Sequence, residues 1–287
     1  MNPVPDLLDH RFIIGIDLGT TNCAVSYVDL QSQGADSPGA MPGPIRTFQI
    51  PQLTGHGEIS ALPVLPSFLY LPGSYDLADD AVSLRRKPDD KRFVGAFARD
   101  HGAKVPSRLV ASAKSWLCHG QVDREASILP WGAAGAESAD ISKVSPVEAT
   151  ALYLEHIKLA WNRRHKGDAD CYLEYQRIII TVPASFDQVA RDLTLRAARQ
   201  AGQGQVTLLE EPLAAFYSWL KTHADSWANQ VRPGELILIC DVGGGTTDLT
   251  LITLQATQGS PRFERIAVGD HLILGGDNID LALARFL

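Results

Sequence analysis

The chain has 287 residues, of which 45% are hydrophobic and 21% are charged. This composition is typical of a globular protein with room for about two domains. A net charge of −7 argues against a nucleic-acid-binding surface, which needs a basic patch. No apolar run approaches the roughly 18 residues that predict a membrane helix. Residues 1–11 lack the pattern of a secretory signal, so we expect a cytoplasmic protein without nucleic-acid or membrane partners.

The first predicted element is a strand–turn–strand unit at residues 12–28. Apolar residues lead into a polar turn and resume after it. The residues of interest are Asp17, Gly19, Thr20, Thr21 and Asn22. Backbone N–H groups in a glycine-containing turn bind anions, and a neighbouring carboxylate suits Mg²⁺. The unit therefore predicts a phosphate-binding hairpin.

The next hundred or so positions give weaker signals. Residues 31–47 are rich in Gly, Pro, Ser and Gln and indicate a surface connection. Short extended pieces are expected over residues 48–71, and helices over residues 94–101 and 107–118. Residues 121–140 show little periodicity, which predicts a loop with a short strand or two.

Helices and strands alternate clearly from Ser145 onward. Ser145, Pro146 and Glu148 form the capping-box pattern that begins a helix. The further predictions are a helix to Gly167, a strand over 177–182, a helix that starts at Ser185–Gln188 and runs to Gln200, a strand over 205–209, and a helix that follows Glu210, Glu211 and Pro212 and runs to about Lys221. This alternation indicates an α/β architecture.

A second hairpin is predicted at residues 236–254. It begins with an apolar run, which we expect to be a buried strand with Cys240 in the core, as Cys23 is in the first hairpin. Its polar residues are Asp241, Gly243, Gly244, Gly245, Thr246 and Asp248. It therefore repeats the first hairpin, and a repeat predicts two similar lobes that offer one hairpin each to a shared cleft. A strand near residues 263–268, a Gly275–Gly276 turn and a helix from Asp277 follow.

Five segments of the chain, in this order, resemble the ATPase domain of the seventy-kilodalton heat-shock chaperones (DnaK type). They are residues 16–22, 180–186, 211–215, 241–248 and 274–280. The resemblance implies an actin-like (ribonuclease-H-like) two-lobed α/β ATPase fold that binds ATP or ADP with Mg²⁺. It places the first lobe at residues 1–230, with an outer subdomain inserted at about 66–143, and the beginning of the second lobe at 231–287. The family's domain runs further, so we expect an incomplete second lobe.

The resemblance also implies roles for individual residues. The nucleotide would be held by Gly19, Thr20, Thr21, Asn22, Gly243, Gly244, Gly245, Thr246, Gly275 and Gly276. Asp17 and Asp241 would hold the waters around Mg²⁺. Glu211 would lie near the attacking water, and Asp248 would assist hydrolysis. Pro183 and Arg191 would relay the nucleotide state to a peptide-binding domain, so co-chaperones and unfolded peptides are the implied partners.

The chain departs from the family at Arg99, where the family has a lysine that is linked to hydrolysis. Arginine keeps the charge but has a planar fork and a different hydration. Arg99 is therefore either catalytic or a partner in a surface ion pair. Three functions stay open: a chaperone-type ATPase, an inactive nucleotide sensor or actin-like scaffold, and a small-molecule kinase of the same superfold. The absence of a Gly-x-x-x-x-Gly-Lys-Ser/Thr motif leaves the phosphate chemistry to the two hairpins.

Overall fold

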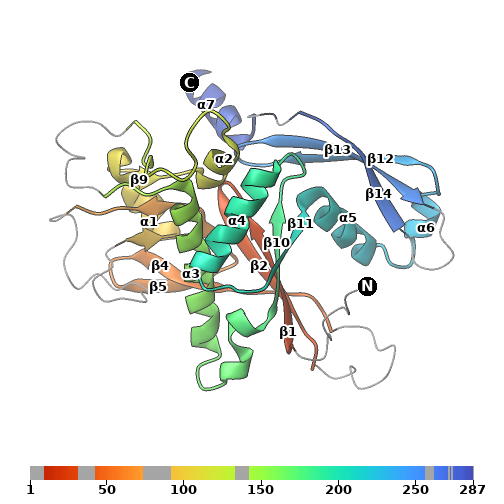
Figure 1. The fold of residues 1–287 in the computed structure, drawn as a ribbon, viewed down its shortest axis with the longest axis horizontal. Helices are drawn as coiled ribbons and strands as arrows, with labels where there is room; N and C mark the ends of the chain where they lie inside the picture. Colours follow the sequence, from red (N-terminus) through yellow and green to blue (C-terminus); the bar gives the residue numbers. More distant parts are fainter. Residues whose placement is uncertain are drawn as a thin grey trace. The chain divides into compact units, whose positions relative to one another are not determined.

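The computed structural model describes residues 10–31, 43–73, 92–132, 142–255, 262–270, 272 and 274–286. It is a mixed α/β protein (Figure 1), as the alternation of elements predicted. The chain forms two compact units. Unit 1 comprises Met1–Ile180 and Val189–Thr207, and unit 2 comprises Thr181–Gln188 and Leu208–Leu287.

The main sheet of unit 1 has the strand order β11-β10-β1-β2-β3, with β6 also paired to β2. Its strands are β1 (Phe12–Leu18), β2 (Asn22–Asp29), β3 (Arg46–Thr47), β6 (Val64–Pro66), β10 (Arg177–Val182) and β11 (Val206–Glu210). The boundary between the units falls within β10 and β11. Strands β1 and β2 pair antiparallel, with Leu18 opposite Cys23. Every second residue of β1 is buried, while Asp17 is exposed on the other face, as expected for strand alternation.

Helix α3 (Pro146–Arg164) packs on the β1–β2 pair. Its predicted cap is confirmed, because the Ser145 hydroxyl accepts the N–H of Glu148 at 3.1 Å. The Glu148 carboxylate accepts a bond from Arg92 at 2.7 Å. Trp161 of α3 is fully buried, with its ring centroid 5.3 Å from that of Phe12 in an edge-to-face contact. Aromatic contacts of this kind add to the hydrophobic burial that holds the helix on the sheet.

Unit 1 also contains several shorter strands and helices. They are β4 (Ile50–Gly55), β5 (Glu58–Leu62), β7 (Leu69–Tyr70), β8 (Phe93–Val94), α1 (Ala96–Gly102), a 3₁₀ turn at Pro106–Arg108, β9 (Leu109–Val110), α2 (Ala113–Cys118), 3₁₀ turns at Ala169–Cys171 and Leu173–Tyr175, and α4 (Gln188–Gln200). The predicted end of α4 is confirmed by a left-handed glycine, Gly202 at φ +76°. Helix α3 ends at Arg164, with His165 as its C-cap, before it reaches the left-handed Gly167 at φ +100°.

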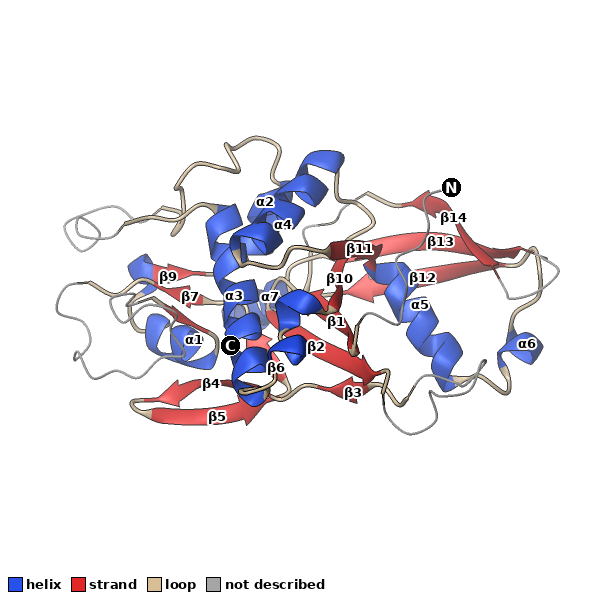
Figure 2. Ribbon diagram, turned by 60° about the horizontal axis from the view of Figure 1, so that its bottom comes forward, coloured by secondary structure: helices blue, strands red, loops and turns tan. Residues whose placement is uncertain are grey.

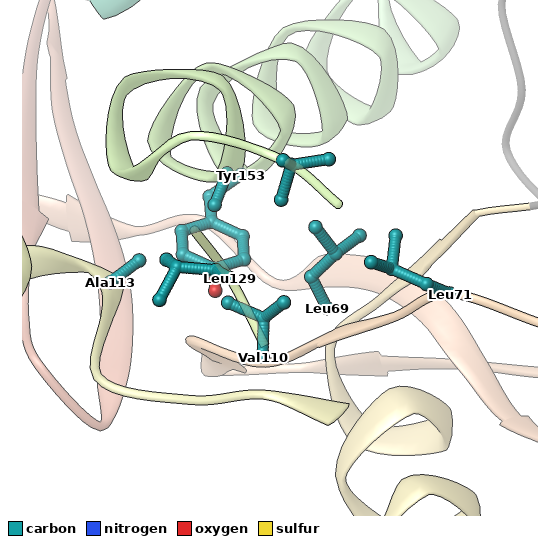
Figure 3. Close-up of a cluster of buried hydrophobic side chains, with 8 residues drawn as sticks. Leu69, Leu71, Val110, Ala113, Leu129 and Tyr153 are labelled. Carbon is teal, nitrogen blue, oxygen red and sulfur yellow. The ribbon is translucent and has the colours of Figure 1, made fainter. Parts of the chain in front are cut away.

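The helix predicted over residues 107–118 is wrong in its first half. Leu109 and Val110 form β9, which pairs with β7, and α2 begins only after Ser112, which has a left-handed φ of +53°. Val110 is buried in a cluster with Leu69 and Tyr153 (Figure 3), so packing overrides the local helical pattern. Residues 121–132 are irregular apart from a bridge at Leu129, as predicted. The remainder of that predicted loop, residues 133–140, and residues 32–42 of the earlier connection lie outside the described residues.

Unit 2 is built on an antiparallel sheet in the order β12-β13-β14. Its elements are α5 (Glu211–Thr222), α6 (Trp227–Gln230), β12 (Leu236–Val242), β13 (Thr247–Gln255), β14 (Arg262–Val268) and α7 (Gly276–Phe286). Helix α5 lies beside this sheet (Figure 2), and the rings of Phe216 and Phe263 are 4.2 Å apart between centroids.

The burial predicted for the first strand of the second hairpin is wrong. Strand β12 forms as expected, but Leu236, Leu238 and Cys240 are exposed. The reason is that β12 lies at the edge of its three-stranded sheet, and the face that carries these residues is not covered by the described part of the chain. Cys23, by contrast, is buried as predicted.

Candidate nucleotide-binding hairpins

The first hairpin turn, residues 19–22, is held by a serine from outside the hairpin. Ser67 donates its hydroxyl to the carbonyl of Gly19 at 2.8 Å and its backbone N–H to the carbonyl of Thr21 at 2.9 Å. The backbone N–H groups of Thr20 and Thr21 receive no partner from the described residues. Two carbonyls of the turn are thus engaged by the protein, and two N–H groups are left for a ligand.

Gly19 and Cys23 show that atoms around this turn are closely packed. A Cβ atom on Gly19 would overlap the backbone oxygen of Asn22, so the turn requires glycine at this position. The Cys23 thiol lies 3.3 Å from the Ser67 hydroxyl. Burial raises the pKa of Cys23 to about 11, which keeps the thiol neutral and makes it a packing residue. Asp17 lies one residue before the last residue of β1, with its side chain exposed.

In the second hairpin turn, as in the first, the protein binds backbone carbonyls and leaves N–H groups without a partner among the described residues. Gly243 donates its N–H to Thr246 at 2.8 Å and closes the turn. The carbonyls of Gly243 and Gly244 accept the first N–H groups of α7, from Gly276 at 3.0 Å and Asp277 at 2.8 Å. The N–H groups of Gly244, Gly245 and Thr246 have no partner among the described residues. Consecutive free N–H groups of this kind form an anion-binding nest.

Gly275 lies against the backbone of this second turn. A Cβ atom there would be 2.5 Å from the carbonyl oxygen of Gly244 and 2.7 Å from that of Gly243. The N–H of Gly275 is held by the Asn278 side chain at 2.9 Å. The Gly275–Gly276 segment therefore supports the turn through its backbone, and glycine is needed at Gly275 because no Cβ fits there.

Two carboxylates face each other across the second hairpin. Asp241 and Asp248 are directly opposite partners in the β12–β13 pair, and like charges in such positions destabilise a sheet. Asp248 is 6% exposed; one of its oxygens accepts the Ser185 hydroxyl at 2.9 Å, and the other lies 3.5 Å from the Thr246 hydroxyl. An opposed pair of this kind fits a divalent cation that keeps much of its water shell. The described residues contain no cluster of three His, Cys, Asp or Glu side chains that would bind a metal directly.

The remaining predicted residues are spread over several elements. Glu211 is half-buried at the start of α5, and its neighbour Glu210 pairs with Arg265 of β14. Arg99 is exposed on α1, and its Nε lies 2.7 Å from the Asp100 carboxylate. That geometry agrees with the surface ion pair which the sequence left open as the alternative.

Pro183 and Arg191, the predicted relay pair, belong to different units. Pro183 is buried directly after β10, and its carbonyl accepts the N–H of Phe186 at 3.2 Å. Arg191 is half-buried on α4.

Sequence reasoning missed three supporting residues, namely Ser67, Ser185 and Asn278. Ser67 meets Gly19 across 48 positions of the chain, and Ser185 meets Asp248 across 63 positions. No local spacing encodes such contacts. A shared hint is that each serine follows a proline by one or two positions and precedes a phenylalanine.

Comparison with known proteins identifies the family. The family model described as "Hsp70 protein" matches residues 82–287, which is more than half of the chain. The "Chaperone protein HscA homolog" of Pseudomonas putida is 31% identical over 293 residues, covering 99% of this chain and 38% of its own length. The homolog of Azotobacter vinelandii is 32% identical over 291 residues, with the same two coverages.

The chain thus spans 38% of the length of these relatives. The helices of the described residues include none with the length and apolar content needed to cross a membrane. The family model over more than half of the chain and these relatives over nearly all of it agree, and the chain belongs to the Hsp70 family.

Proposed function

We propose that this chain binds ATP with Mg²⁺ through the turns of its two hairpins and hydrolyses it, as part of a two-lobed actin-like ATPase domain. One observation carries the proposal. In both turns the protein engages backbone carbonyls and leaves neighbouring N–H groups without a partner in the described chain. Such turns suit phosphate oxygens, which accept hydrogen bonds and cannot donate them when ionised.

The carboxylates suit the metal that accompanies ATP. Asp17 is exposed at the end of β1, and Asp241 is opposed by a second carboxylate on β13. In this proposal both hold water molecules of a Mg²⁺ ion, in keeping with the preference of that ion for oxygen ligands and retained water. The ion supplies neutralisation of phosphate charge when it is bound.

Hydrolysis then depends on positioning more than on covalent chemistry. Glu211 orients a water molecule toward the γ-phosphorus. The water oxygen forms a bond to that phosphorus while the bond to the β,γ-bridging oxygen breaks, which gives ADP and phosphate. Asp248 accepts the proton of the water, and the turn N–H groups stabilise the phosphate oxygens.

The proposal is tested by calorimetric titration of ATP into the 287-residue chain with and without Mg²⁺. We expect metal-dependent binding that the variant Asp17→Asn, Asp241→Asn loses. Asp225→Asn is the matched control, because Asp225 is exposed and outside both hairpins. Equal binding by the double variant and the control contradicts the proposal, as does a folded chain that binds no ATP.

A second function is favoured by the ion pair of Arg99. With its guanidinium on Asp100, Arg99 is occupied at the surface, and the chain would bind nucleotide as a sensor without turning it over. Single-turnover hydrolysis by Arg99→Lys separates the two functions. A faster rate than that of the unmodified chain favours the sensor, whereas a slower rate assigns Arg99 to catalysis.

We also propose that the longer protein to which such a segment belongs is a cytoplasmic chaperone. Its relatives are named as chaperone proteins, and the ATPase part would be coupled to peptide and co-chaperone binding. Pro183 and Arg191 are the proposed relay. Peptide-stimulated turnover of the longer protein, lost in Pro183→Ala or Arg191→Ala, is the expected result.

A further inference from the structure

We propose that Ser185 is a positioning residue that holds the Asp248 carboxylate for ATP hydrolysis. This inference rests on the proposed function, because Asp248 acts there on the attacking water. The Ser185 hydroxyl donates to an Asp248 oxygen at 2.9 Å. Both residues belong to unit 2, although 63 positions separate them in the chain.

The hydroxyl of Ser185 is carried by a rigid piece of backbone. Pro183 and Ala184 are buried, and the N–H of Phe186 donates a hydrogen bond to the carbonyl of Pro183 at 3.2 Å. The Phe186 side chain is 6% exposed and anchors the far side of this turn. A group mounted on such a turn is positioned by packing and has little freedom to follow a moving partner.

Asp248 needs such a partner because it is buried and faces another carboxylate. At 6% exposure it has lost most of its water, and a buried carboxylate is costly unless it is hydrogen-bonded. Asp241 lies opposite it across the strand pair. The Thr246 hydroxyl is 3.5 Å from the other oxygen, so the bond from Ser185 is the shorter of these two hydroxyl contacts and fixes the plane of the carboxylate more firmly.

Replacing Ser185 by alanine removes the hydroxyl bond that holds one Asp248 oxygen in position. A catalytic group displaced by about 1 Å loses up to roughly 100-fold in rate. We expect Ser185→Ala to slow single-turnover ATP hydrolysis by roughly 10- to 100-fold, while the Kd for ATP stays within about twofold because the turn N–H groups are unchanged. Ser185→Thr, which keeps the hydroxyl, is expected to restore most of the rate.

The experiment uses the 287-residue chain and a matched serine control. Ser60→Ala removes an exposed hydroxyl of β5 that contacts Thr54 of β4, so it tests the loss of a serine far from Asp248 in sequence and in a different unit. A rate drop in Ser185→Ala, restored in Ser185→Thr and absent in Ser60→Ala, supports the inference. Equal rates in Ser185→Ala and the unmodified chain overturn it, and so does a Ser185→Thr variant as slow as Ser185→Ala.

A double-mutant cycle tests the contact without relying on turnover. Ser185→Ala, Asp248→Ala and the double variant are compared by their urea unfolding midpoints. We expect the double variant to unfold close to Asp248→Ala, because the two side chains lose one shared interaction. Additive shifts overturn the inference. If the chain binds no ATP, the proposed function fails. If the unfolding shifts are non-additive but the chain hydrolyses no ATP, Ser185 is only a structural partner of Asp248. That result also overturns its positioning role.

Discussion

The first hairpin is packed against a helix, whereas the second leaves an apolar row of its leading strand exposed. In β1 the residues Phe12, Ile14 and Ile16 are at most 2% exposed, beneath α3. In β12 the corresponding alternate residues Leu236 and Leu238 are 64% and 60% exposed. In both turns, nevertheless, backbone carbonyls accept hydrogen bonds from the protein while neighbouring N–H groups have no partner among the described residues. Two hairpins with one sequence pattern can therefore share the arrangement of their turn N–H and carbonyl groups while they differ in how they are stabilised.

Adding one methyl group to each turn is expected to give the largest difference between the two hairpins. In Gly19→Ala the new Cβ overlaps the backbone oxygen of Asn22, whereas in Gly243→Ala it stands 3.4 Å from the oxygen of Thr246. We expect Gly19→Ala to lower the free energy of unfolding by more than about 3 kcal/mol, because a backbone atom must move. Gly243→Ala is expected to cost about 1 kcal/mol or less.

Urea unfolding of both variants measures this difference. Gly204→Ala is the control, because a Cβ there meets no atom within 4 Å. Similar losses in Gly19→Ala and Gly243→Ala would show that the first turn relaxes as easily as the second.

The turns could be predicted from the sequence, because glycines and paired hydroxyls at Gly19, Thr20 and Gly243 specify local backbone geometry. The Ser145 cap and the strand over 177–182 were equally local and are confirmed. Burial of β12 could not be predicted, since apolar strands look alike whether or not another element covers them. The contacts of Ser67 and Ser185 could not be predicted either, because contacts between distant positions produce no periodic sequence pattern.

A second prediction uses pH to weaken unit 1 alone. His156 of α3 is buried and donates to the carbonyl of Pro51 at 3.0 Å, and burial lowers its pKa to about 4. In the unfolded chain the pKa is about 6.5, so between these values the unfolded state binds more protons and stability falls as the pH falls. The contribution is complete above pH 6.5. We expect roughly 3 kcal/mol to be lost by about pH 4.

Hydrogen exchange from pH 7 to 4, after correction for the intrinsic rate, locates the effect. Peptides from α3 and β4 are expected to lose protection more than peptides from β12 and β13. His156→Gln keeps a donor for Pro51 without titrating in this range, so it is expected to flatten the response of α3. An unchanged response in that variant would assign the acid effect to other groups.

A third, smaller effect is expected at the serine that holds the first turn. Ser67→Ala removes the hydroxyl bond to the carbonyl of Gly19 and keeps the backbone bond to Thr21. Losing one hydrogen bond in a buried place costs about 1–2 kcal/mol. We also expect weaker ATP binding, because the turn N–H groups become less ordered. Calorimetry and urea unfolding measure the two effects, and Ser60→Ala is the control; a variant with unchanged affinity would show that Ser67 does not order the turn for ligand binding.

Thiol labelling of the folded chain compares the two strand pairs directly and leaves the sequence unchanged. Cys23 is buried behind the first turn with its pKa raised to about 11 by burial, so it is both inaccessible and protonated. Cys240 lies in the exposed row of β12, where a reagent can reach its sulfur atom. We expect Cys240 to react with a disulfide reagent in the native chain and Cys23 to react only after unfolding, as read by mass spectrometry of tryptic peptides. A Cys240 as slow as Cys23 would mean that the edge strand of unit 2 is covered in solution, and the contrast between the two hairpins would then lie in their turns alone.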